Sequence, residues 1–83
     1  MIEFYKAVVQ GVFPKGKHGP YAIASSKEVK GRITFSLTEA WEEDEFPEPG
    51  HFVILSGLTK KRAGWRAQHA RFFKPEDEER AVK

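Results

Sequence analysis

"RITFSL", residues 32–37, is the stretch that decides the fold, because polar and apolar side chains alternate through it. In an extended chain the apolar residues fall on one face and the polar residues on the other: Ile33, Phe35 and Leu37 against Arg32, Thr34 and Ser36. A period of two residues is typical of a β-strand with one buried face. We therefore expect this segment to be a strand with its apolar side in a small core.

Segments on both sides of this strand share its strand-favouring composition, rich in Val, Ile, Phe and Tyr; they are residues 3–13, 21–26, 51–56 and 65–73. The stretches between them are rich in Gly, Pro and Lys, which predicts turns and loops. Only the acidic stretch 38–46 is long enough to form a helical turn, with Thr38 as its cap. The sequence predicts an all-β, five-stranded small barrel with a short helical turn between strands three and four.

The length of 83 residues favours one domain, with a barrel over residues 1–74 and a polar C-terminal tail over residues 75–83. Pro75 and the acids after it suit the start of a short helix in that tail. The chain has no cysteine, which excludes disulfides and thiolate metal sites, and its three histidines lack metal-ligand spacing. We expect no metal and no cofactor. The lack of a membrane-length apolar run and of a signal-peptide pattern leads us to expect a cytoplasmic protein.

Four motifs, "GPYAIAS", "GRITFSL", "PEPGHFVIL" and "KKRAGWRAQHA", follow one another in an order that resembles the cold-shock domain, a five-stranded OB-fold barrel. The resemblance covers roughly residues 5–73. It implies binding of single-stranded nucleic acid through aromatic side chains on the first three strands. Tyr21 holds one of these positions, whereas Ile23, Thr34 and Ser36 stand where the family has aromatic rings or a histidine. The strand-one aromatic has no certain counterpart, because the loop after it is lengthened.

"GVFPKGKH", residues 11–18, is one residue short of a P-loop, since His18 stands where a Ser or Thr hydroxyl would bind Mg²⁺. The residues that follow have a strand pattern rather than the helix that a P-loop requires. We therefore interpret this stretch as a connection between strands. Lys15, Lys17 and His18 either lie near the nucleic-acid side as charges for phosphate or belong to a solvated loop.

"KKRAGWR", residues 60–66, surrounds Trp65 with four cations: Lys60, Lys61, Arg62 and Arg66. Positive charge beside an aromatic ring is how proteins hold single strands, by neutralising phosphate and stacking on bases. The alternative is a solvated hairpin with Trp65 folded over the end of the barrel. We favour binding, because an exposed tryptophan without a use is costly.

The segment 39–48 carries six acids, which repel a phosphate backbone, so we expect nucleic acid to avoid this side of the molecule. A solubilising surface is the simpler interpretation, and a contact for a basic protein, ribosomal or other, is the functional one. We expect Trp41 and Phe46 to pack onto the barrel. No catalytic arrangement of residues can be assembled, which argues against an enzyme.

The sequence thus predicts a module for single-stranded nucleic acid of low sequence specificity, with RNA more expected than DNA. Tyr21 and Trp65 would stack on bases, and the cations would contact phosphates; the predicted site is Lys15, Lys17, His18, Tyr21, Lys60, Lys61, Arg62, Trp65 and Arg66. The alternative is a protein–protein or ribosome-associated adaptor on a barrel that has lost its base-stacking face.

Overall fold

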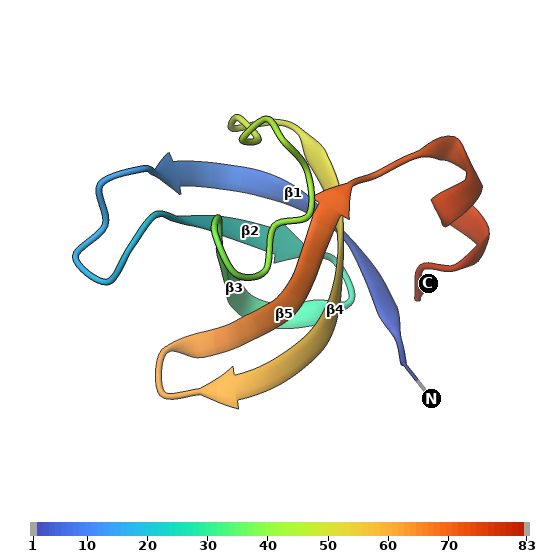
Figure 1. The fold of residues 1–83 in the computed structure, drawn as a ribbon. Coiled ribbons are helices and arrows are strands. Elements are labelled where there is room, and N and C mark those ends of the chain that lie inside the picture. Colours follow the sequence, from blue (N-terminus) through green and yellow to red (C-terminus); the bar gives the residue numbers. More distant parts are fainter. Residues whose placement is uncertain (1, 83) are drawn as a thin grey trace.

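The structure, a computed structural model, describes residues 2–82, so residues 1 and 83 at the ends of the expected barrel and tail lie outside the described part. Five strands form a closed barrel in the order β1-β2-β3-β5-β4 (Figure 1). They are β1 (Phe4–Phe13), β2 (Tyr21–Ser26), β3 (Val29–Ser36), β4 (Phe52–Lys61) and β5 (Gly64–Phe72). Neighbouring strands are antiparallel except β3 and β5, which are parallel. The predicted all-β five-stranded barrel is confirmed.

The alternation in residues 32–37 is a true strand signal, since Ile33 and Phe35 are completely buried. The core combines larger side chains, among them Val9, Val53 and Leu55, with five alanines on the strands; they are Ala7, Ala22, Ala24, Ala67 and Ala70. A narrow barrel has room for only a few large side chains in its interior, so alanine on the inward positions allows the strands to close.

A β-bulge in β1 changes which side chains face outward. Val9 pairs with Ala24 and Gly11 with Ile23, so Gln10 is an extra residue relative to β2. Before the bulge Val9 faces the core; after it Val12 packs against the core. Without the bulge a strict alternation from Val9 would direct Phe13 inward. The bulge therefore places Phe13 on the outer face of the barrel.

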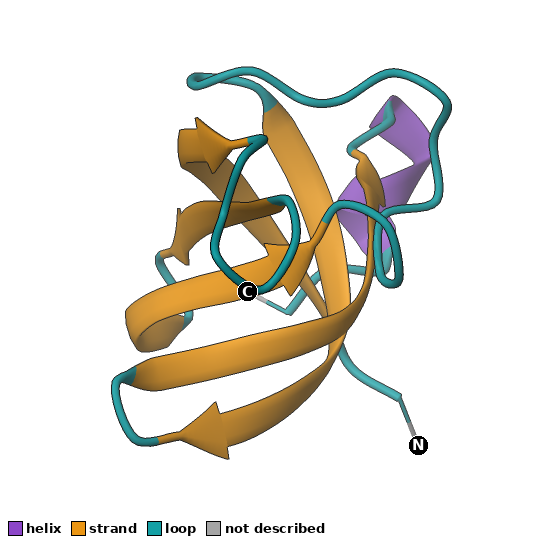
Figure 2. Cartoon of the chain, turned by 60° about the vertical axis from the view of Figure 1, so that its left-hand side comes forward, coloured by secondary structure: helices purple, strands orange, loops and turns teal. Residues whose placement is uncertain are grey.

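The helical turn expected between strands three and four is wrong: this segment forms turns without a helix (Figure 2). The Ser36 hydroxyl, rather than Thr38, accepts the backbone N–H groups at the start of the segment, those of residues 38 and 39, at 3.2 and 3.0 Å. The backbone then forms two hydrogen bonds with β5. The carbonyl of Ala40 accepts from the amide of Ala70 at 3.1 Å, and the amide of Glu42 donates to the carbonyl of Ala70 at 2.9 Å. Backbone groups that pair with a strand are not available for a helix.

Trp41 holds this segment on the barrel. Its ring is 7% exposed and packs 5.7 Å from Phe35 and 4.9 Å from Phe72, centroid to centroid. Its indole N–H donates to the carbonyl of Glu45 at 2.7 Å. The expectation that Trp41 packs onto the barrel is confirmed, but the same expectation for Phe46 is wrong, because Phe46 is 45% exposed.

The tail carries the helix of the described residues 2–82, a 3₁₀ helix from Pro75 to Glu79 that begins with proline as expected. It is fastened by Asp77, a fully buried carboxylate that accepts two hydrogen bonds from the Arg71 guanidinium at 2.8 and 2.9 Å. Figure 1 shows the tail on one side of the barrel and the β1–β2 loop on the other. Within residues 2–82 we find no helix with the length and apolar character needed to span a membrane.

Candidate nucleic-acid interface

An aromatic pair lies on the outer face of the barrel, where β1 ends and β2 begins. Phe13 and Tyr21 are partners in the β-ladder, and their rings stack with centroids 4.9 Å apart and planes 19° apart. Phe13 is 41% exposed, so its ring is available to a ligand. Phe13 is thus an outward aromatic on the first strand that is absent from the predicted site. The bulge at Gln10 hid it, because alternation alone assigns Phe13 to the core.

The β1–β2 loop projects from the barrel (Figure 1), and within it Gly16 lies against the ring of Tyr21. A methyl group on Gly16 would lie 2.7 Å from a ring carbon of Tyr21, so only glycine allows this approach. The amide of Gly19 closes the turn by donating to the carbonyl of Gly16 at 3.0 Å. The stretch that resembles a P-loop therefore connects two strands, β1 and β2, and is followed by a strand rather than a helix.

This packing creates a groove of about 330 Å³ beside the ring. We call it the Tyr21 groove; it is lined by Tyr21, Lys17, His18, Thr34, Glu39 and Arg66. A second, adjacent groove, the Lys61 groove, shares residues 36, 39 and 66 with it and adds Thr59, Lys61 and Gln68. The two grooves bring cations from the β1–β2 loop, β4 and β5 to one side of the barrel.

The β4–β5 hairpin divides the predicted cations between two faces. Thr59 pairs with Arg66, and Lys60 pairs with Trp65. Successive residues of a strand face opposite ways, so Lys61 and Arg66 lie on the outer face whereas Lys60 and Trp65 lie on the other. The run "KKRAGWR" therefore does not act as one basic cluster around a tryptophan.

Trp65 is folded over the end of the barrel. Its ring is half-buried against the core, and its indole N–H donates to the carbonyl of Lys30 at 3.2 Å. The ammonium of Lys60 lies 4.9 Å from the centroid of this ring, a cation–π contact within the protein. Trp65 and Lys60 line a separate groove together with Tyr5 and Leu58. This arrangement corresponds to the alternative that the sequence left open for Trp65.

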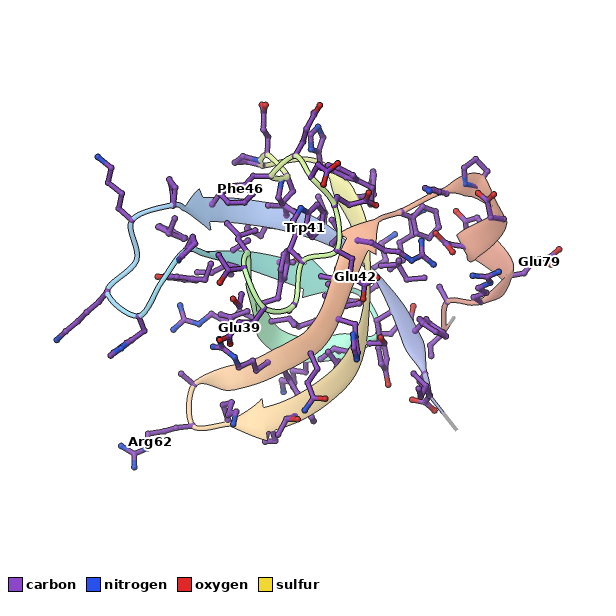
Figure 3. All side chains as sticks on the ribbon, viewed as in Figure 1. Glu39, Trp41, Glu42, Phe46, Arg62 and Glu79 are labelled. Atoms are coloured by element: carbon purple, nitrogen blue, oxygen red, sulfur yellow. The ribbon has the colours of Figure 1, made fainter. Side chains whose placement is uncertain are left out.

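The two remaining predicted cations stand at loop tips. Lys15 is exposed in the β1–β2 loop, and Arg62 extends from the turn of the β4–β5 hairpin (Figure 3). The structure thus brings together five of the predicted residues around the two adjoining grooves; they are Lys17, His18, Tyr21, Lys61 and Arg66.

Within residues 2–82, the outer face of β2, β3 and β5 carries no Phe or Trp, and Tyr21 is its one tyrosine. Ile23 pairs with Thr34 on neighbouring strands, and Thr34 pairs with Arg66. The hydroxyl of Thr34 donates to the carbonyl of Trp65 at 3.4 Å, which ties β3 to β5. The stacking surface is therefore limited to the Phe13–Tyr21 pair at one edge of a polar, cationic face.

Two of the six acids of the segment 39–48, Glu42 and Glu43, bond to β5. Glu42 bonds His69 at 3.2 Å, and Glu43 accepts the backbone N–H of Phe72 at 3.2 Å. Glu39 differs from them, because it lines both grooves beside Arg66. Glu39 therefore lies beside predicted cations, and the expectation that nucleic acid avoids the acidic segment stays a prediction.

Among residues 2–82 no group of three or more histidines and acids is placed to hold a metal ion. Comparison of the chain with protein-family models, with curated proteins and with solved structures finds no match.

Proposed function

We propose that the protein binds single-stranded nucleic acid across the outer face formed by β2, β3 and β5. One observation carries the proposal: an exposed phenylalanine, Phe13, stacks on Tyr21 beside a groove that collects Lys17, His18 and Arg66. Rings that are open to solvent stack on bases, and the neighbouring cations neutralise phosphates. RNA and DNA both present these two chemistries.

The size of the surface sets the kind of binding. A single aromatic pair stacks on only one or two bases, and base stacking contributes about 1–3 kcal/mol per base. Lys17, Lys61 and Arg66 add contacts to phosphate, which carry no sequence information. We therefore expect modest affinity, strong salt dependence and little sequence preference outside the positions that contact the grooves.

A protein-binding role is the second candidate. It is favoured by Ile23 and Thr34, which occupy the middle of the outer face where further rings would be needed for stacking along a strand. A barrel of this kind would bind a protein partner tightly and free oligonucleotides negligibly. The experiment below separates the two candidates.

The test is a polarisation titration with a fluorescently labelled single strand of about ten nucleotides, a length suited to one barrel of this type. An external label is required, because neither Trp41 nor Trp65 lies in the proposed face. RNA and DNA are compared at about 50 and 200 mM salt, where binding should weaken steeply. Absence of binding at low salt would contradict the proposal and favour the adaptor.

Charge variants assign the binding to the grooves. The double substitution of Lys17→Gln and Arg66→Gln should weaken binding and reduce the slope of log affinity against log salt by roughly 1.4, about 0.7 per lost phosphate contact to a single strand. Lys27→Gln is the matched control, since Lys27 is exposed and lines a different groove that includes Phe52 and Val82. Equal effects of the double variant and the control would show that the grooves are not the site.

A further inference from the structure

Glu39 is placed at the junction of the two cationic grooves, in the turn that follows β3. Its backbone N–H donates to the hydroxyl of Ser36 at 3.0 Å, which fixes the backbone at this point. Its side chain is exposed and lies between this turn and β5 (Figure 3). It lines the Tyr21 groove and the Lys61 groove at once.

Among the residues that the structure describes, the carboxylate of Glu39 has no polar partner. Lys17 and Arg66 line the same groove, yet within residues 2–82 Glu39 takes part in no salt bridge and its side chain makes no hydrogen bond. On a surface that only neutralises phosphate, a negative charge is unfavourable, because it repels the phosphate backbone of the nucleic acid. A ligand group other than phosphate, one that donates hydrogen bonds, fits against this carboxylate.

A carboxylate accepts hydrogen bonds and donates none, so it distinguishes bases by the donors on their edges. In a single strand the Watson–Crick edge is free to be read. Guanine presents two adjacent N–H donors there, N1–H and N2–H, which match the two carboxylate oxygens. Uracil presents a single N–H between two carbonyl oxygens, and both of these repel a carboxylate.

We propose that Glu39 selects guanine at the base position next to the Phe13–Tyr21 pair. The inference deepens the proposed function and rests on it. The rings supply stacking that any base satisfies, Arg66 and Lys17 supply phosphate contacts, and the Glu39 carboxylate accepts both donors of the guanine edge. A bidentate contact of this kind discriminates between bases by about 1–3 kcal/mol, which corresponds to roughly 5- to 150-fold in affinity.

The experiment measures base preference at one position. Labelled RNAs of about nine nucleotides are all uridine except for a single central G, A, C or U. A single guanine avoids the association of G-rich strands. Wild-type protein should bind the G-containing strand at least about 5-fold more tightly than the all-uridine strand.

Glu39→Gln keeps the size and shape of the side chain but replaces one acceptor oxygen with a donor NH₂ group. It should bring the ratio of G to U affinity close to one, while affinity for the all-uridine strand is unchanged or higher. Glu79→Gln is the matched control: it removes the same charge from the exposed tail, away from the grooves (Figure 3), and should leave the ratio at its wild-type value.

The outcomes separate this inference from the proposed function. Salt-dependent binding of all four strands with equal affinities by the wild-type protein would overturn the role of Glu39 and leave the binding face intact. If the Glu39→Gln variant bound all four strands more tightly than the wild-type protein by the same factor, the inference would also be overturned, because Glu39 would then act only as a repelling charge. If the wild-type protein bound none of the strands, both the inference and the proposed function would be wrong.

Discussion

At the scale of single residues, exposure and neighbours decide what a chemically suitable side chain can do. Trp65 and Phe13 are both aromatic residues near basic loops. Trp65 uses its N–H and its ring face within the protein, in contacts to Lys30 and Lys60. Phe13 stacks one side of its ring on Tyr21 and remains 41% exposed. The smaller ring is therefore the better candidate for stacking on a base.

Phe13→Ala tests this assignment. The substitution removes an exposed ring that closes no part of the core, so the free energy of unfolding should fall by less than about 1.5 kcal/mol. Affinity for a single strand should fall by roughly 10-fold, the effect of one lost base stack, with an unchanged salt slope.

Phe52→Ala is the control for this variant, since Phe52 is also an exposed phenylalanine but contacts Lys6 on the tail side of the barrel. Polarisation titrations of both variants measure the effect. A similar loss of affinity in both would contradict a specific stacking role for Phe13.

At the scale of elements, the segment 37–50 forms part of the barrel wall although it has no regular structure. Backbone hydrogen bonds join Ala40 and Glu42 to Ala70 in β5, and the amide of Gly50 donates to the carbonyl of Val9 in β1 at 2.8 Å. Gly50 has a φ of 94°, a left-handed conformation that favours glycine. This segment sets the position of Glu39, because Glu39 lies where the chain leaves β3.

Trp41→Ala should loosen this whole segment. The buried indole packs on Phe35 and Phe72, so its loss should reduce the free energy of unfolding by about 3–5 kcal/mol. Phe46→Ala, in the same segment, is the control and should cost less than about 1 kcal/mol, because Phe46 is largely exposed. Urea denaturation measures both values. Equal costs would show that Trp41 does not anchor the segment.

At the scale of the whole molecule, the tail and the proposed interface lie on different sides of the barrel (Figure 1). The tail is joined to β5 by the Arg71–Asp77 pair and to β1 by the amide of Val82, which donates to the carbonyl of Phe4 at 2.8 Å. The buried Asp77 carboxylate thus links the stability of the molecule to pH without being part of the grooves.

The hydrogen bonds from Arg71 lower the pKa of Asp77 from 3.8 to about 2, against the opposing effect of its burial. Because the pKa is lower in the folded state, the pair stabilises the protein above about pH 4, and this stabilisation is lost as pH falls from about 4 to about 2. The shift corresponds to about 2 kcal/mol at neutral pH. Asp77→Asn should lose about this much and flatten the pH dependence in that range.

Urea denaturation between about pH 2 and 7 measures the effect of Asp77, with Glu76→Gln as the control in the same tail. Glu76 is exposed, and its substitution should leave both the stability and its pH dependence nearly unchanged. An Asp77→Asn variant as stable as the wild-type protein at pH 7 would contradict the role assigned to the pair.

The sequence by itself determined the features that local patterns encode. Period-two alternation in residues 32–37, strand-favouring composition and Gly- or Pro-rich turns predicted five strands in a barrel, and Pro75 predicted the start of the tail helix. These signals are readable because the residues that produce them are close together in the chain. The helical turn at Thr38 failed, because Ser36 and the distant β5 compete for the same backbone groups.

Only the tertiary structure decided which side chains share a surface. The bulge at Gln10 turns Phe13 outward, the hairpin register separates Lys60 from Lys61, and the turn after β3 brings Glu39 beside Arg66. Each of these outcomes depends on strand pairing or packing between residues far apart in the chain. A shift of one residue in pairing exchanges the two faces of a strand, so composition alone leaves the binding face undetermined.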